Sequence, residues 1–206
     1  RLSQQKPSLP SNLQSLVNKY QPQIYSITSS NPQATLSPDQ IKRMYGLRDE
    51  LYFNLKTRGY SKEIPDLETA VNTRREHDLK IVMNFTDASM VFYASRSKLK
   101  DIGKEKAKKI LSIIIKYKAV VNIYRDRGDL LFKLLNHQNN VERYVEGESN
   151  CSKNIGVEYI EFMIQQSQIY MEQGKYKEAI DVLERTYMTE PSSQGLIDAL
   201  CATYEK

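Results

Sequence analysis

Residues 163–204 read MIQQSQIYMEQGKYKEAIDVLERTYMTEPSSQGLIDALCATY, and this stretch decides the fold. Apolar residues recur in it every three or four positions, which is the spacing of one helix face. Gly174 interrupts the pattern once, and Pro191 followed by Ser192 and Ser193 interrupts it again. We therefore predict helices at about 155–173, 176–189 and 194–205. Short loops between amphipathic helices indicate antiparallel neighbours.

Positions 34 residues apart in this stretch carry related residues. Gln166, Ser167 and Tyr170 are followed at that step by Leu200, Cys201 and Tyr204. The residues that would set the packing of one such unit are Tyr170, Gly174, Tyr176, Ala179, Leu183 and Pro191. With this spacing, residues 160–206 resemble the tetratricopeptide repeat (TPR), a helix–turn–helix unit of about 34 residues. The resemblance covers one repeat and one further helix.

The resemblance implies an all-α fold of antiparallel helical hairpins, stacked as a TPR-like right-handed solenoid or helical array. It also places Ala179 where another helix passes close by, and Cys201 at a small packing position, where we expect a core thiol. Several positions depart from the family pattern. Met163 stands where the family prefers Trp and Gln166 where it prefers Leu, while Ser167 replaces Gly and Thr186 replaces a small apolar residue.

Upstream of the repeat, the sequence predicts longer helices and few turns. Gly and Pro number only 8 and 7 in the 206 residues. The predicted helices are 11–20, 38–56, 66–94 with a break near 84–88, and 104–135 with Gly128 as a weak point. The expected organisation is an N-terminal arm or linker with one short helix at 1–37, a helical bundle or divergent repeats at 38–146, and a TPR-like region at 154–206.

The charge of the chain is unevenly distributed. Residues 96–127, the basic segment, hold eleven bases and three acids, whereas residues 154–206 hold nine acids and four bases. Three interpretations stay open for the basic segment: a contact for RNA or DNA phosphates, with Tyr117 and Tyr124 nearby, a contact for an acidic protein, or the solvated face of one helix. The candidate contact residues are Lys98, Lys100, Lys104, Lys106, Lys108, Lys109, Lys116 and Lys118.

Nothing in the sequence favours an enzyme, a metal site or a cofactor. His77 and His137 are the only histidines and lie on different predicted helices, so no catalytic or zinc constellation is indicated. The longest apolar run, Ile110 to Val121, contains Lys116 and Lys118 and is too short to span a bilayer. We expect no membrane insertion, an intracellular location in cytoplasm or nucleus, and a parent protein of which this chain is a piece.

These observations favour a non-catalytic scaffold or adaptor that binds another protein, as a peptide or helix in a concave groove, within a larger assembly. The residues expected to contact that partner are Asn154, Glu158, Glu161, Gln165 and Gln168. Two alternatives remain: nucleic-acid binding through residues 96–127, and a TPR sensor or dimerisation module of a transcriptional regulator.

Overall fold

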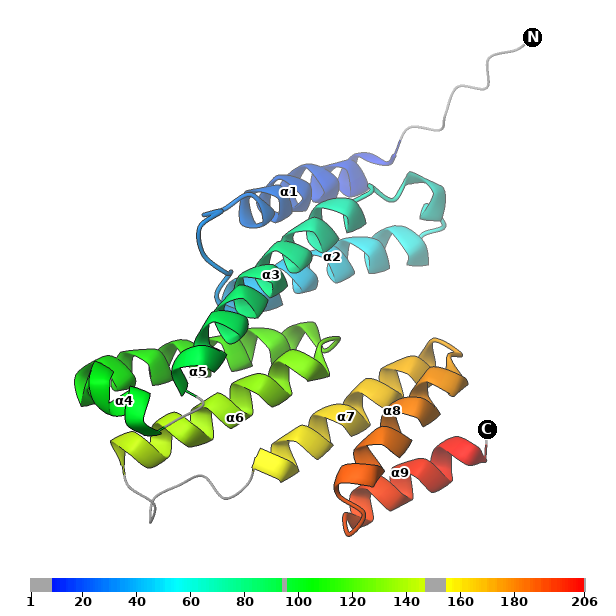
Figure 1. Cartoon of the computed structure of the whole chain (residues 1–206). Helices are drawn as coiled ribbons and strands as arrows, with labels where there is room; N and C mark the ends of the chain where they lie inside the picture. Colours follow the sequence, from blue (N-terminus) through cyan, green and yellow to red (C-terminus); the bar gives the residue numbers. More distant parts are fainter. Residues whose placement is uncertain (1–8, 94–95, 147–154, 206) are drawn as a thin grey trace. The chain divides into compact units, whose positions relative to one another are not determined.

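The computed structural model describes residues 9–93, 96–146 and 155–205, without the side chains of 89–93, 96–98, 155, 156, 158 and 189. Every regular element in these ranges is helical, so the expected all-helical fold is confirmed (Figure 1). The elements are α1 (Ser11–Thr28), α2 (Pro38–Thr57), the 3-10 turn η1 (Ser61–Glu63), α3 (Glu68–Tyr93), α4 (Arg96–Ile102), α5 (Lys104–Tyr124), α6 (Gly128–Val145), α7 (Ile155–Glu172), α8 (Tyr176–Thr189) and α9 (Gln194–Tyr204).

The first helix is longer than the sequence predicts. The prediction ended it near residue 20, but α1 continues through Pro22 to Thr28. A proline inside a helix removes one backbone hydrogen bond and costs about 3 kcal/mol. The buried side chains of Tyr20 and Ile24 carry the apolar face of α1 across this point and against α2, so packing outweighs the local preference.

The start of α2 follows the sequence prediction. Ser37 caps the helix, because its side chain accepts a hydrogen bond from the Gln40 amide and the Gln40 side chain accepts one from the Ser37 amide. Pro38 occupies the first turn, where its missing N–H costs nothing. This reciprocal capping box fixes the end of the loop that joins α1 to α2.

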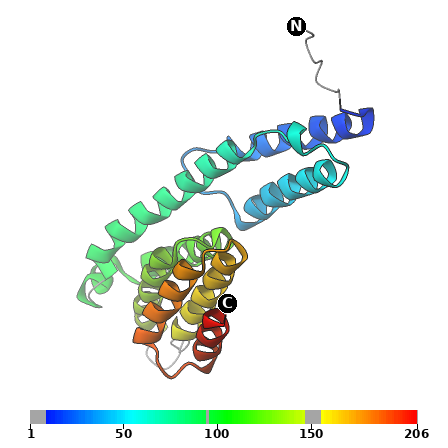
Figure 2. The same cartoon turned by 90° about the vertical axis from the view of Figure 1, so that its right-hand side faces the viewer.

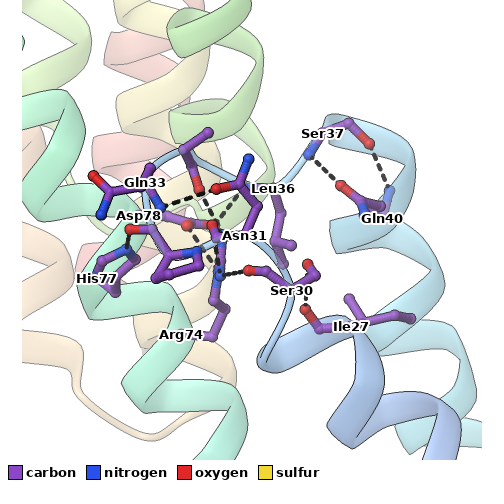
Figure 3. A network of polar contacts seen from close by, with 12 residues as sticks. Ile27, Ser30, Asn31, Gln33, Leu36, Ser37, Gln40, Arg74, His77 and Asp78 are labelled. Carbon is purple, nitrogen blue, oxygen red and sulfur yellow. Dashed lines mark hydrogen bonds and ion pairs between the residues drawn. The ribbon is translucent and has the colours of Figure 1, made fainter.

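That loop, residues 29–37, is held by two buried charges on α3 (Figure 3). Arg74 and Asp78 form an ion pair of 2.9 Å with almost fully buried side chains. Arg74 also donates hydrogen bonds to the carbonyl oxygens of Ser30 and Ala34, and Asp78 accepts one from the Leu36 amide. The loop therefore satisfies its backbone polar groups through α3.

The chain divides into two units, residues 1–81 and 82–206, and α3 contributes residues to both. The break predicted near 84–88 does not occur, since α3 is continuous from Glu68 to Tyr93. In the second unit, α3 contacts both partners of the next hairpin. Phe85 meets the Tyr117 ring of α5 edge to face, and Asp87 forms an ion pair with Lys133 of α6.

The predicted helix over 104–135 was wrong, because the chain turns at residues 125–127 and forms two helices, α5 and α6, that pack against each other. Arg125 adopts a left-handed conformation with φ of 58° and ends α5. Gly128 then begins α6 beside α7, where an added Cβ would lie 2.7 Å from the Met163 sulfur. The close approach of α6 and α7 thus explains why glycine occupies position 128, which the sequence prediction treated as a weak point within one helix.

From α5 onward, each helix packs against its successor, and α7 also contacts α9 (Figure 2). Ile160 of α7, Leu183 of α8 and Leu196 of α9 form one buried cluster. The predicted helices at 155–173, 176–189 and 194–205 are confirmed to within one residue at each end. This three-helix group positions the surface considered next.

Candidate protein-interaction site

The turn between α7 and α8 depends on one glycine. Gly174 has φ of +71°, a conformation that glycine adopts without strain. The Lys175 amide returns to the Tyr170 carbonyl at 2.8 Å, and the Gly174 amide to the Met171 carbonyl at 2.9 Å. These bonds satisfy the last carbonyls of α7 and let α8 fold back along it.

The small and large residues of the repeat pattern lie where α7 and α8 meet. Ala179 and Leu183 are fully buried, and so are the substituted positions Ser167 and Thr186. The Ser167 hydroxyl donates to the Ile164 carbonyl, and that of Thr186 to the Val182 carbonyl, both at 2.7 Å. Each hydroxyl is therefore satisfied within its own helix, which explains how these polar residues fit a buried interface. Tyr170 is half-buried, while Tyr176 and Pro191 are exposed.

Four of the five predicted partner-binding residues belong to α7. Glu161, Gln165 and Gln168 are all exposed and, at spacings of four and three, share one helix face. Asn154 lies outside the described residues, and so does the side chain of Glu158. The face offers carboxylate and amide groups, which suit a polar contact but give little apolar area.

The lysines of the basic segment are spread around the solvent side of α4 and α5. The exposed ones are Lys100, Lys104, Lys106, Lys108, Lys109 and Lys116, with Lys118 half-buried. The side chain of Lys98 lies outside the described part. Lys108 forms an exposed ion pair with Glu105 at 3.0 Å.

The two tyrosines expected to assist these lysines face inward. Tyr124 is buried, and Tyr117 packs edge to face on Phe85 with 5.1 Å between ring centroids. Burial also raises the pKa of the Tyr117 hydroxyl. Neither ring is therefore placed as an open stacking surface for a nucleic-acid base, which is how aromatic residues contribute to single-strand binding.

A surface hollow of about 480 Å³ lies between α8 and α9, and we refer to it as the α8–α9 hollow. Its lining residues are Asp181, Glu184, Arg185, Tyr187, Met188, Leu200 and Tyr204. Met188 is 82% exposed and Tyr204 is 59% exposed, so both large side chains face solvent at the hollow. Large apolar groups gathered at one exposed place mark interaction surfaces more often than isolated ones do.

The charged residues of the hollow form contacts within α8 and between α8 and α9. Asp181 and Arg185 form an ion pair of 2.9 Å along α8. The Tyr204 hydroxyl donates a hydrogen bond across to Glu184, and this bond, with desolvation and the nearby carboxylate charge, raises the pKa of Tyr204. The tyrosine ring is thereby held over the hollow with its polar end anchored.

Sequence reasoning missed this hollow and misjudged one of its neighbours. Cys201, expected to be a core thiol, is exposed, so that prediction was wrong. The physical reason is that α9 presents this side of its surface to solvent in the described structure.

A second hollow, of about 360 Å³, lies in the first unit beside the loop at 29–37. It is lined by Thr28, Ser29, Pro32, Ala70, Thr73, Arg74 and His77. Its polar groups already serve the fold: Arg74 holds loop carbonyls, and His77 Nε2 lies 2.8 Å from the Pro32 carbonyl oxygen (Figure 3). We therefore assign this hollow a structural role.

Within the described ranges, His, Cys, Asp and Glu side chains nowhere gather in threes that could hold a metal ion. In the same ranges, every helix is too short or too polar to cross a membrane. No family model matches this chain, and neither does any curated protein or solved structure.

Proposed function

We propose that this chain is a non-catalytic helical scaffold that binds another protein, with α7, α8 and α9 as a TPR-like unit. The observation that carries the proposal is the α8–α9 hollow. It combines exposed Met188 and Tyr204 with a charged margin that includes Glu184. An apolar centre inside a polar rim is the usual composition of a protein interface.

The packing of the second unit supports a scaffold role. Helices from α5 to α9 contact their neighbours in sequence, as the elements of repeat proteins do. The polar face of α7, with Glu161, Gln165 and Gln168, provides a second contact zone on the same three-helix group. Within this proposal, the exposed lysines of α5 are a solvated helix face that keeps the chain soluble.

The test compares recovery of partner proteins by tagged versions of the 206-residue chain in cells, with quantification by mass spectrometry. One variant carries Met188→Glu and Tyr204→Gln, both at exposed positions. It should lose at least about nine-tenths of a specific partner, because a buried interfacial anchor is worth about 1.4 kcal/mol or more, a tenfold change in affinity.

Two matched variants locate the contact. Glu161→Lys with Gln168→Lys alters the α7 face, and replacement of Lys104, Lys106, Lys108 and Lys109 by Gln alters α5. The α5 variant should recover the partner as well as the unaltered chain does. Full recovery by both the hollow and the α7 variants would refute a protein-binding role for α7–α9. Selective loss of a bound RNA or protein in the α5 variant would instead assign function to the basic segment.

A further inference from the structure

The middle of α2 carries a glycine that the packing of its own unit does not explain. Gly46 is exposed, and an added Cβ there would meet no atom within 4 Å. Glycine weakens the interior of a helix, because it loses more backbone freedom than any other residue. Gly128 is accounted for by the close approach of α7. At Gly46, by contrast, the described structure leaves the space beside the backbone open.

A large aromatic side chain lies on the same exposed side of α2. Phe53 is 67% exposed. It follows Gly46 by seven residues, about two helical turns, so the two positions face nearly the same direction. The buried residues of α2 are on the opposite side of the helix: Ile41, Met44, Leu51 and Leu55. An apolar group therefore stands exposed beside a stretch of backbone that another helix can approach closely.

Opposite charges flank Gly46 along this side of α2. Lys42 and Arg43 precede it by four and three residues, and Asp49 and Glu50 follow it by three and four. All four are exposed, and at 100° per residue each lies within about 60° of Gly46 around the helix. We call these four residues, Gly46 and Phe53 the α2 face.

This arrangement of charges selects one orientation for a second α2 helix. If two copies of α2 cross antiparallel at Gly46, Lys42 and Arg43 of each copy lie beside Asp49 and Glu50 of the other. A parallel pair would instead bring like charges together, which opposes association. The α2 face is therefore complementary to itself only in the antiparallel, two-fold arrangement.

The contacts that Arg43 and Glu50 make within the chain do not neutralise them. Arg43 donates a hydrogen bond of 2.8 Å to the Gln23 side chain. Glu50 accepts one of 2.7 Å from the Tyr20 hydroxyl, and this contact raises the pKa of Tyr20, so the hydroxyl stays protonated. Both partners are neutral and lie on α1, which packs beside α2 (Figure 1). The charges of Arg43 and Glu50 thus remain to act on a second molecule.

Asp49 is already paired within the chain, and its contribution is smaller. It lies 2.8 Å from Arg48, which also forms an ion pair with Glu68. One arginine thus serves two carboxylates, and the Asp49 side chain remains 64% exposed. Glu50 is therefore the main acidic contact that the α2 face offers, with Asp49 beside it.

We propose that the α2 face binds a second copy of this chain, with the two α2 helices crossing antiparallel at Gly46 about a two-fold axis. Lys42 and Arg43 of each copy then meet Glu50 of the other, so every favourable contact is made twice. Phe53 of each copy covers the first turn of the other copy's α2. This inference concerns the first unit and goes beyond the proposed function, which rests on α7–α9.

Sedimentation velocity of the full chain at about 5 to 500 µM tests for this dimer. One helix face makes a small interface, so we expect a dissociation constant on the order of 100 µM. Raising NaCl from about 50 to 500 mM should weaken the dimer at least about threefold, because salt screens exposed charges. A chain that stays monomeric up to about 500 µM overturns the proposal.

Two charge-reversed chains test the pairing itself. Lys42→Glu with Arg43→Glu makes the α2 face acidic, and Asp49→Lys with Glu50→Lys makes it basic. Each chain alone should dimerise at least about tenfold more weakly than the unaltered chain. An equimolar mixture, with one chain fluorescently labelled, should form a heterodimer, since every base again meets an acid. Undiminished self-association of either chain, or a mixture of folded chains that stays monomeric, contradicts the antiparallel arrangement.

Gly46→Leu tests the close approach independently of charge. Leucine favours a helix more than glycine does, so the stability of α1–α2 should not fall. The dimer should nevertheless weaken at least about tenfold, because the added bulk separates the two helices. Asn122→Leu, at an exposed position of α5, supplies the matched control and should leave the dimer unchanged. Normal dimerisation of the Gly46→Leu chain overturns the inference.

The variant with Met188→Glu and Tyr204→Gln separates this inference from the proposed function. It should lose the cellular partner expected at the α8–α9 hollow but dimerise as the unaltered chain does. If it loses the dimer while the Gly46→Leu chain keeps it, the contact between copies belongs to the hollow and the role of the α2 face is refuted.

Discussion

The buried ion pair between Arg74 and Asp78 offers the sharpest test of how the first unit is held together. Three variants of the full chain form a double-mutant cycle: Asp78→Ala, Arg74→Met, and both together. Methionine keeps much of the length of the arginine stem while removing its charge and its hydrogen bonds. The pair is buried and also binds the loop at 29–37, so each single change should affect both the charge balance and the loop (Figure 3).

The magnitude follows from what each change leaves behind. Asp78→Ala leaves the Arg74 guanidinium without its carboxylate in a buried position, a loss of about 3–5 kcal/mol. It also removes the acceptor of the Leu36 amide, which lies 3.1 Å from the Asp78 carboxylate. Arg74→Met leaves the buried Asp78 carboxylate without the Arg74 guanidinium and removes the donor to the Ser30 and Ala34 carbonyls. The double variant retains neither charge, so its loss should fall about 2–3 kcal/mol short of the sum.

The assay must resolve the two units, because a chain with two units need not unfold in one transition. Hydrogen exchange with mass spectrometry, followed through a urea titration, reports α1–α2 peptides and α7–α9 peptides separately. A loss of 3 kcal/mol with a slope of about 1 kcal/mol per molar urea moves the midpoint of the α1–α2 peptides by about 3 M. The α7–α9 peptides serve as an internal reference.

An ion pair whose carboxylate is exposed supplies the control in the same unit. Arg48 and Asp49 lie 2.8 Å apart, and the Asp49 side chain is well exposed. Asp49→Ala should cost less than about 1 kcal/mol, as exposed pairs do. If Asp78→Ala costs no more than this control, or if the two buried substitutions are additive, the reasoning that the ion pair closes the loop is refuted.

Three smaller predictions concern single side chains, each measured by urea titration with peptide-resolved hydrogen exchange. Leu183 is fully buried, so Leu183→Ala should destabilise α7–α9 by about 2–5 kcal/mol, and an unchanged midpoint would contradict its core position. Burial lowers the pKa of His137, so the unfolded chain binds the proton more readily below about pH 6.5, and acidification should destabilise the second unit. His137→Gln should reduce this acid sensitivity, and equal sensitivity would exclude His137 as its source. Ser37→Ala removes the cap of α2 and should cost about 1 kcal/mol, whereas Ser37→Asp should restore most of it. If the unaltered chain and the two Ser37 variants were equally stable, the Ser37 cap would not contribute to the stability of α2.

Local signals allowed the prediction of those elements whose ends depend on their own residues. The start of α2 could be read from Ser37 and Pro38, and the turn after α7 from Gly174, because caps and positive-φ glycines act over a few neighbouring residues. The extension of α1 through Pro22 could not be read in this way. It depends on packing against α2, which local sequence does not specify.

The sequence prediction missed the turn between α5 and α6 for a related reason. Apolar spacing continues across residues 125–127, so periodicity alone predicts one long helix. What separates the two helices is the left-handed Arg125, a conformation that an ordinary residue adopts only where its surroundings demand it. The same limit applied to Tyr117, whose position beside lysines in the sequence gave no hint that Phe85 would cover its ring.

At the candidate site, the 34-residue spacing predicted some of the packing residues but not their exposure. It placed Leu200 and Tyr204 at packing positions, yet it could not say whether a helix of this chain covers them. The exposure of Cys201 shows an open side instead. Spacing identifies which residues are suited to contact, whereas burial depends on which elements are actually adjacent.

The residue types around α8 and α9 distinguish a permanent core from a surface that can be covered and uncovered. The buried cluster uses the aliphatic residues Ile160, Leu183 and Leu196. The hollow beside it uses Tyr204 and Met188 among its largest exposed side chains. Tyrosine tolerates water through its hydroxyl, and methionine adapts its shape to a partner, so both suit a surface that alternates between solvent and protein. A face meant for continuous burial would favour the branched aliphatics of the cluster. The exposed tyrosine and methionine of the hollow therefore suit the reversible protein contact that we propose for it.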